Sequence, residues 1–226
     1  MHVPNAPRLS IAALGLALLA GCGGASEPDT PPRVNVASCP ATVIPLTQPE
    51  IDEASFMREE ETLARDVYLD LAEHWTAQAG QVPVVTIMSN ISQAEQEHMD
   101  SMKAVLDCYG LPDPMAAGET RGVFINTELA QLYTDLIARG QTSQGEALHV
   151  GALIEEVDIE DLVTSIAISQ QDYTDQVYEN LMCGSRNHLR AFAGEIIKTE
   201  GRYTAQWLDQ AEVDAIVNSP SERCGR

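Results

Sequence analysis

The stretch from Ile87 to Tyr109, IMSNISQAEQEHMDSMKAVLDCY, decides the fold. Its apolar residues recur at the three-and-four spacing of an amphipathic helix, which predicts one buried stripe formed by Ile87, Ile91, Met102, Val105 and Tyr109. Glu95 and His98 fall in the same stripe. Side chains three positions apart on a helix lie on the same face, and a buried carboxylate is costly without a partner. The pair therefore predicts a buried metal ion.

A helix is predicted to precede this stretch and to begin near Glu50. Its inner face is formed by Phe56, Glu60, Leu63, Val67 and Leu71. Glu60 is a carboxylate within an otherwise apolar stripe, whereas Glu59 and Glu61 flank the stripe and are expected to be solvated. Gly80 and Pro83 interrupt the pattern, so the two helices are expected to form an antiparallel hairpin.

Two further long helices are predicted to begin near Ser143 and Asp172. Their inner faces carry polar residues among apolar ones, namely Glu155, Asp158 and His188. Charged residues beside the face of the first of these helices are expected to be solvated: Glu156, Glu160 and Asp161. A short helix in the preceding connection is expected to begin at Asn126 or Thr127 and to end at Gly140. The fold class is therefore all-α, an antiparallel four-helix bundle with a short extra helix in the crossover.

The polar residues of the four inner faces are expected to lie at one level of the bundle. In an antiparallel hairpin, residues equally far from the turn lie at similar heights, because each residue rises about 1.5 Å. Glu95 lies 15 residues after Gly80, and Glu60 lies 20 residues before it. Glu155 likewise lies 15 residues before the second turn, near Gln170. The candidate metal ligands are therefore Glu60, Glu95, His98, Glu155, Asp158 and His188.

This set of side chains offers oxygen and nitrogen ligands and no sulfur. Such a mixture favours iron or manganese, with zinc as a further candidate. Four-helix bundles that bind two metals take a Glu from two helices and Glu-x-x-His from the other two. The alternative is a buried network of hydrogen-bonded Glu and His side chains without a metal.

Several stretches resemble the ferritin-like di-iron carboxylate proteins and, more closely, the domain-of-unknown-function 2202 family (DUF2202). They are Glu59-Glu60-Glu61, residues 63–68, Glu95-x-x-His98-Met99-Asp100, residues 151–159, residues 178–181 and residues 184–190. The resemblance implies a ferritin-like bundle with a centre of two iron ions, or of manganese or zinc. It further implies an oxidoreductase, such as a ferroxidase, that uses dioxygen or peroxide. The other functions to weigh are a metal-binding or sensing module without turnover and a purely structural bundle.

The roles of the ligands follow from the same resemblance. Glu95 is expected to bridge two metals, and His98 and His188 each to bind one. Ser185 stands where the broader family pattern has a Glu. Either Asp158 supplies the missing carboxylate from across the core, or the site holds one metal or binds the second weakly. Tyr178 is expected to be a core residue, the alternative being a hydrogen-bond donor to the ligands or a redox-active group.

The composition excludes several partners. The chain has 226 residues, 44% of them hydrophobic, and a formal charge of −21, so nucleic acids and anionic lipid surfaces are not expected to bind. No Ser or Cys lies in a recognisable nucleophile motif, and no glycine-rich phosphate loop is present. The oligomeric state is left open.

The N-terminal residues have the pattern of a targeting signal. Arg8 precedes a short apolar run, and Leu19-Ala20-Gly21-Cys22 resembles the lipobox of bacterial lipoproteins. We expect a signal peptide at residues 1–21 and a lipidated Cys22 with a flexible tether at 22–49. The bundle is expected at 50–201 and a tail packed on it at 202–226. The protein is thus expected outside the cytoplasm, anchored to a membrane by lipid, the alternative being an ordinary secretory signal.

The remaining four cysteines are expected to form two disulfides, because such bonds persist outside the cytoplasm. Three pairings are possible. Cys108 ends its helix close to where the first helix begins, within reach of Cys39 on the tether. The tail can run back along the fourth helix and bring Cys224 to Cys183. We therefore predict the pairs Cys39–Cys108 and Cys183–Cys224.

Overall fold

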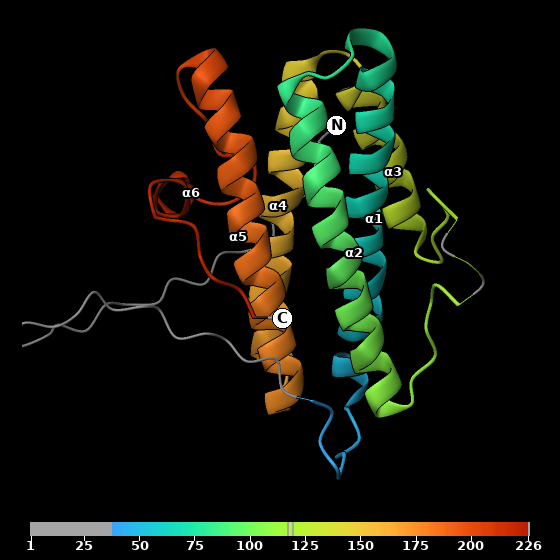
Figure 1. The fold of residues 1–226 in the computed structure, drawn as a ribbon. Helices are drawn as coiled ribbons and strands as arrows, with labels where there is room; N and C mark the ends of the chain where they lie inside the picture. The colour runs from blue at the N-terminus through green and yellow to red at the C-terminus, as the bar shows by residue number, and fades with distance from the viewer. Residues whose placement is uncertain (1–37, 117, 119, 226) are drawn as a thin grey trace, which may run out of the picture. The chain divides into compact units, whose positions relative to one another are not determined.

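The computed structural model describes residues 38–116, 118 and 120–225, and every regular element in this part of the chain is a helix (Figure 1). The elements are α1 (Gln48–Ala79), α2 (Pro83–Tyr109), α3 (Thr127–Gly140), α4 (Gln144–Ile168), α5 (Asp172–Glu200) and α6 (Gln210–Val217). The predicted all-α class and the extra helix in the crossover are confirmed.

The four long helices form two hairpins. Helix α1 ends at Gly80, whose φ of 71° is unfavourable for residues with a side chain, and α2 follows with Pro83 in its first turn. Helices α4 and α5 pair in the same way, and α5 ends at Gly201. Helix α1 also contacts α4, and α2 contacts α5, so the four helices surround one shared interior.

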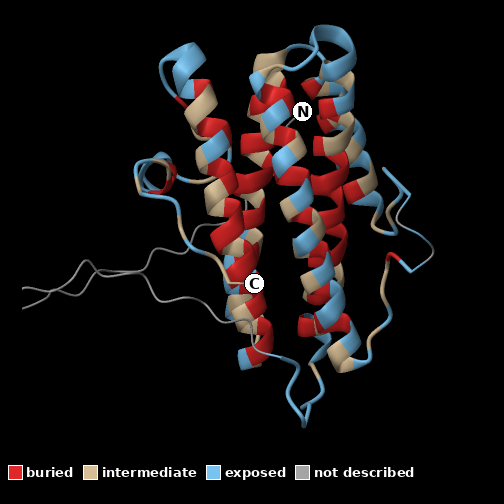
Figure 2. Cartoon of the chain, in the orientation of Figure 1, coloured by how far each residue is buried: buried red, intermediate tan, exposed pale blue. Residues whose placement is uncertain are grey.

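The interior contains two apolar clusters and a polar layer. Buried residues run along the inner faces of the long helices (Figure 2). The larger cluster includes Leu63, Met88 and Phe192, and the smaller one includes Met57 and Met102. Buried polar side chains are concentrated in residues 58–62 of α1, 92–95 of α2, 155–158 of α4 and 180–188 of α5. The level of polar residues expected from the turns is therefore present.

The connection before α3 is held by two buried carboxylates of α1. Glu59 accepts hydrogen bonds from the backbone N–H groups of Ile125 (2.6 Å) and Asn126 (2.9 Å). Asp66 accepts one from the N–H of Gly122 (2.9 Å). The expectation that Glu59 is solvated was wrong, because it satisfies backbone donors of a segment more than 60 residues away.

The C-terminal segment is anchored in the same manner on α4. The carboxylate of Glu156 accepts the hydroxyl hydrogen of Tyr203 and backbone N–H groups of Gln206, Trp207 and Leu208. Glu156 is fully buried, which corrects the expectation that it is solvated. Of the two acids grouped with it, Glu160 is exposed as expected, whereas Asp161 is half-buried.

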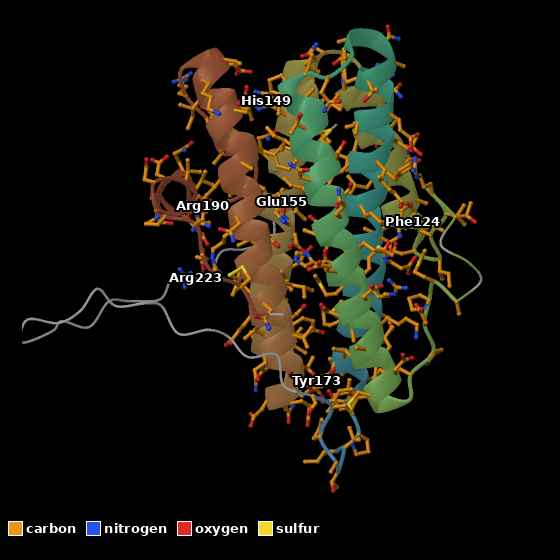
Figure 3. The ribbon with its side chains drawn as sticks, viewed as in Figure 1. Phe124, His149, Glu155, Tyr173, Arg190 and Arg223 are labelled. Atoms are coloured by element: carbon orange, nitrogen blue, oxygen red, sulfur yellow. A yellow bond between two sulfur atoms is a disulfide. The ribbon has the colours of Figure 1, made fainter. Side chains whose placement is uncertain are left out.

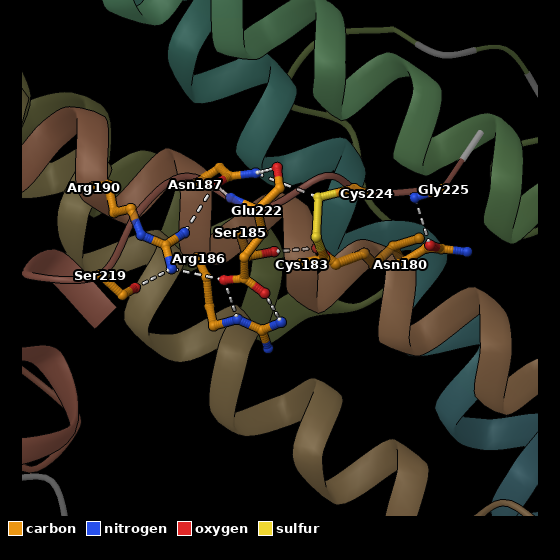
Figure 4. The surroundings of a disulfide bond; sticks show 11 residues. Asn180, Cys183, Ser185, Arg186, Asn187, Arg190, Ser219, Glu222, Cys224 and Gly225 are labelled. Atoms are coloured by element: carbon orange, nitrogen blue, oxygen red, sulfur yellow. Dashed lines mark hydrogen bonds and ion pairs between the residues drawn. A yellow bond between two sulfur atoms is a disulfide. The ribbon is translucent and has the colours of Figure 1, made fainter. Parts of the chain in front are cut away.

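Both predicted disulfides are confirmed. Cys39 is bonded to Cys108 and Cys183 to Cys224, with Cα atoms 5.7 and 5.6 Å apart. The second bond fixes the tail beside α5 (Figure 4).

No helix in the described part of the chain is long and apolar enough to cross a membrane. The predicted signal peptide and Cys22 lie outside the described residues, as does the predicted tether up to residue 37.

Candidate metal centre

Glu95 of α2 lies between two imidazoles from different helices. Its Oε2 atom is 2.7 Å from Nδ1 of His98, one turn further along α2. Its Oε1 atom is 2.9 Å from Nδ1 of His188 on α5. The Glu95 side chain is only 2% exposed. One carboxylate therefore faces a different histidine with each of its oxygens.

Each histidine also faces a second carboxylate. Nδ1 of His98 is 3.2 Å from Oε2 of Glu61 on α1, and Nδ1 of His188 is 3.5 Å from Oε2 of Glu155 on α4. Two groups of three residues result, Glu61–Glu95–His98 and Glu95–Glu155–His188, which share Glu95. Within each group the ligand atoms lie within 4.8 Å of one another. The labelled Glu155 shows the level of this layer in the bundle (Figure 3).

These residues fit metal ions. Two ligand atoms about 2.1 Å from one ion and at right angles to each other are about 3 Å apart, close to the separations found here. Among the described residues, several buried atoms of the two groups also lack a hydrogen-bond partner: Oε1 of Glu61, Oε1 of Glu95 and Nδ1 of His188. Since buried polar atoms are nearly always satisfied, such atoms converging on one place indicate a cation there.

Three buried acids elsewhere in the bundle have hydrogen-bond partners in the protein backbone. Glu59 and Glu156 accept backbone N–H groups from loops, and Glu50 accepts those of Thr47 and Gln170. The backbone donors satisfy the hydrogen-bonding capacity of these carboxylates, which in turn stabilise the loops that supply the donors. Glu61 and Glu95 are instead placed opposite imidazoles. Their backbone donors thus mark Glu50, Glu59 and Glu156 as structural acids, in contrast to Glu61 and Glu95.

In the metal-free centre, the buried acids and histidines shift one another's pKa values. Burial raises the pKa of Glu61 to about 7, although the neighbouring His98 opposes the change. Burial alone would also raise the pKa of Glu95, but His188 and His98 outweigh it and hold that pKa below its ordinary value. Burial disfavours the charged form of His188, yet Glu95 and Glu155 raise its pKa to about 10. Protons therefore neutralise this cluster when no metal does, and metal binding must displace them.

Tyr68 of α1 orients Glu155. Its hydroxyl group donates a hydrogen bond of 2.5 Å to Oε1 of Glu155, and Tyr68 is fully buried. This leaves Oε2 of Glu155 facing His188. Sequence reasoning missed Tyr68 and considered Tyr178, which packs in the smaller apolar cluster as a core residue.

Gly184 of α5 provides space for His98. A Cβ atom at this position would lie 2.5 Å from Nε2 and 2.7 Å from Cε1 of His98. Any larger residue would force the imidazole to move, so the glycine permits α5 to approach α2 at the centre.

The structure brings four of the six sequence-predicted ligands into the two groups: Glu95, His98, Glu155 and His188. Glu60 is buried but lies outside the groups, where burial, Asp161 and Asp158 raise its pKa. Its neighbour Glu61, which was expected to be solvated, is 2% exposed and faces His98. That expectation was wrong.

Asp158 of α4 lies beside Ser185 of α5. Its Oδ2 atom accepts a hydrogen bond from the hydroxyl group of Ser185, and its buried Oδ1 atom has no hydrogen-bond partner in the described part of the chain. Asp158 thus contacts Ser185 from across the core, although it is outside the two groups of ligand atoms.

A second apolar stripe on α1 could have identified Glu61. Ala54, Met57, Ala64 and Tyr68 are all buried at helical spacing, and Glu61 lies on the same line. The stripe through Phe56 indicates Glu60 instead, but Phe56 is only half-buried.

Comparison with known proteins agrees with this architecture. The model of the family described as "Uncharacterized protein domain (DUF2202)" matches residues 50–220. The uncharacterised protein MJ0754 of Methanocaldococcus jannaschii is 41% identical over 179 residues, which are 79% of this chain and 92% of that protein. A crystal structure of the hypothetical protein MJ0754 superposes with a TM-score of 0.74 at 39% identity, covering 81% of this chain and 99% of the other. The chain therefore belongs to the DUF2202 family.

Proposed function

We propose that this protein is a ferritin-like metalloprotein that binds two transition-metal ions in the polar layer. One ion would be held by Glu61, His98 and Glu95, and the other by Glu95, Glu155 and His188. The observation that carries the proposal is the position of Glu95, whose two carboxylate oxygens face two histidines from different helices. A carboxylate placed in this way suits a bridge between two ions.

Iron is the metal that we propose, with manganese or zinc as alternatives, because the ligands are carboxylates and imidazoles without sulfur. Bound iron would supply one-electron redox chemistry toward dioxygen or peroxide, and the activity would be that of a ferroxidase or a related oxidoreductase. The protein's own part is to hold the ligands apart from bulk water and to orient them. Tyr68 fixes Glu155, Gly184 leaves room for His98, and the acids balance the added positive charge.

The proposed location is outside the cytoplasm, with a lipid anchor at Cys22. Two disulfides support an oxidising compartment. The sequence around Cys22 supports the anchor.

The test is metal analysis by mass spectrometry after anaerobic loading of the full-length protein with ferrous iron. Wild-type protein should retain about two ions per chain, as expected for a bridged pair. Glu95→Gln should lose both, whereas Glu179→Gln, at an exposed position on α5, should retain them. Oxygen consumption by the loaded protein then separates an oxidoreductase from a protein that only binds metal. Equal, negligible metal in all three proteins would refute the proposed function.

A further inference from the structure

A pocket of about 490 Å³ lies between α2 and α5 and leads to the histidines of the metal centre. Its walls include Ala94 and Ser101 of α2 and Leu181 and Gly184 of α5. His98 and His188 line it as well, with side chains 12% and 10% exposed. The volume is far above the roughly 10–15 Å³ that a single water needs and falls within the range of about 300–1,000 Å³ typical of pockets for small molecules.

The C-terminal segment forms one wall of this pocket and is firmly attached. Cys224 is bonded to Cys183, and the N–H of Gly225 donates a hydrogen bond of 2.9 Å to Oδ1 of Asn180 (Figure 4). The carboxylate of Glu222 forms ion pairs with Arg186 and Arg190 of α5. The wall is therefore a built part of the fold.

Asn180 supplies a hydrogen-bond donor at the pocket without a partner in the protein. It is 7% exposed, and its Nδ2 atom has no hydrogen-bond partner among the described residues. The bond from Gly225 fixes the oxygen toward the tail, so the amide nitrogen is turned away from it (Figure 4). A buried donor of this kind calls for an acceptor from a ligand.

The acidic residues around the pocket disfavour an anion as that ligand. Glu97 and Asp100 line it, and the whole chain carries a formal charge of −21. The unpartnered donor of Asn180 disfavours a cation beside it. An uncharged molecule with a hydrogen-bond acceptor satisfies both conditions, and the side chains of Ala94, Val177 and Leu181 offer it apolar walls.

We propose that this pocket binds a small uncharged organic molecule, whose acceptor group bonds to Asn180 while its other end lies at the histidine edge of the metal centre. Asn180 precedes Gly184 by one helical turn, about 6 Å along α5, and His98 lies against Gly184. A molecule that reaches from the centre to Asn180 is therefore larger than dioxygen or peroxide. This inference rests on the proposed function, because it names the substrate class of the same centre.

Two pyridines of similar size provide the probes. The ring nitrogen of 4-acetylpyridine can bind a metal and its carbonyl can accept a hydrogen bond, whereas 4-ethylpyridine has no acceptor at that end. Each is titrated into full-length protein loaded with Co²⁺, and the visible spectrum of the ion reports binding. The acetyl group also weakens the ring nitrogen as a ligand, so the affinity ratio of the two probes is compared between proteins. The ratio of 4-acetylpyridine to 4-ethylpyridine should be about fivefold higher in wild-type protein than in Asn180→Asp, the factor that a net hydrogen bond of about 1 kcal/mol gives.

Three variants locate the binding. Asn180→Asp keeps the oxygen that faces Gly225 but removes the donor, so the relative preference for 4-acetylpyridine should fall by that factor. Ser101→Trp should fill the pocket and weaken both probes by at least about tenfold, which corresponds to about 1.4 kcal/mol. Gln93→Trp places the same ring at an exposed position of α2 outside the pocket and should bind both probes normally.

The experiment distinguishes failure of the proposed pocket from failure of the proposed metal centre. Wild-type protein that binds Co²⁺ but neither pyridine, or a Ser101→Trp protein that binds both as wild type does, overturns the pocket and leaves the metal centre standing. A Ser101→Trp protein that fails to load Co²⁺ leaves the decision to Asn180→Asp, whose unchanged preference for 4-acetylpyridine overturns the proposed contact. Failure of wild-type protein to bind Co²⁺ refutes the proposed function itself.

Discussion

Oε1 of Glu95 and Nδ1 of His188 lie 2.9 Å apart in the middle of the bundle, and neither atom has a well-directed hydrogen bond to any described residue. Ligands that share a metal ion approach one another in this way, because each directs its lone pair at the ion rather than at its neighbour. A metal ion shared by Glu95 and His188 would produce this arrangement, and the following predictions depend on it.

Replacing Tyr68 by Phe should weaken the ion held by Glu155 and His188 more than the other ion. The change removes the hydroxyl group that bonds to Oε1 of Glu155, so this carboxylate loses its fixed orientation. Loss of such an outer partner typically lowers metal affinity about 10- to 100-fold. Calorimetric titration with Co²⁺ should show one weakened site out of two. Equal weakening of both sites, or of neither, would contradict the assigned role.

Gly184→Ala should reduce metal binding, because its new methyl group would meet the imidazole of His98 at 2.5 Å. The matched control is Gly194→Ala on the same helix, where a Cβ atom meets nothing within 4 Å. That control should bind metal normally and be more stable by about 0.5–1 kcal/mol, as Ala is the better helix former. Metal content and urea unfolding report both effects. Normal metal content in Gly184→Ala would show that His98 can move without loss.

The metal-free protein should lose stability as the pH rises from about 6 to 9. The pKa of His188 is raised to about 10, above the unfolded value of about 6.5, so its contribution is complete below pH 6.5 and is lost as the pH rises through 10. The raised pKa of Glu61, about 7, acts in the same direction from about pH 4.5 upward. Glu95 acts oppositely, because its lowered pKa costs stability only in acid.

Bound metal replaces these protons, so the difference in melting temperature between metal-loaded and metal-free protein should grow with pH over the same interval. Thermal unfolding monitored by circular dichroism, with and without Co²⁺, measures this difference. A gap that shrinks with rising pH would argue against displacement of protons by the metal.

Removing either disulfide by paired Cys→Ser changes should cost about 4 kcal/mol of unfolding free energy. The loops closed by Cys39–Cys108 and Cys183–Cys224 span 69 and 41 residues, and the chain-entropy cost depends only weakly on loop length. Chemical unfolding without reductant provides the measurement. Neither pair contributes a ligand, so metal stoichiometry should remain unchanged, and a loss of metal in both variants would contradict the separation of fold and site.

The sequence predicted the helices well because their ends carry local signals. Ser143 and Asn126 cap α4 and α3 with their side chains, and Gly80 and Gly201 end α1 and α5 with positive φ. These preferences act within a few residues and need no knowledge of the tertiary fold.

The site was predicted only in part, because three consecutive acids leave the rotation of α1 undecided. Glu59, Glu60 and Glu61 are all buried, and each faces a different partner: loop backbone, Asp161 and His98. Adjacent helical residues differ by about 100° in direction, so an error of one residue changes the ligand. Tyr68 could not be assigned, since its partner Glu155 is 87 residues away.

The central claim is that Glu95 bridges two metal ions. Anomalous X-ray diffraction from crystals of Co²⁺-loaded protein tests it most directly, because it locates each ion. We predict two peaks, one beside His98 and Glu61 and the other beside His188 and Glu155, with Glu95 between them. A single peak away from Glu95, or no peak within the polar layer, would contradict the claim.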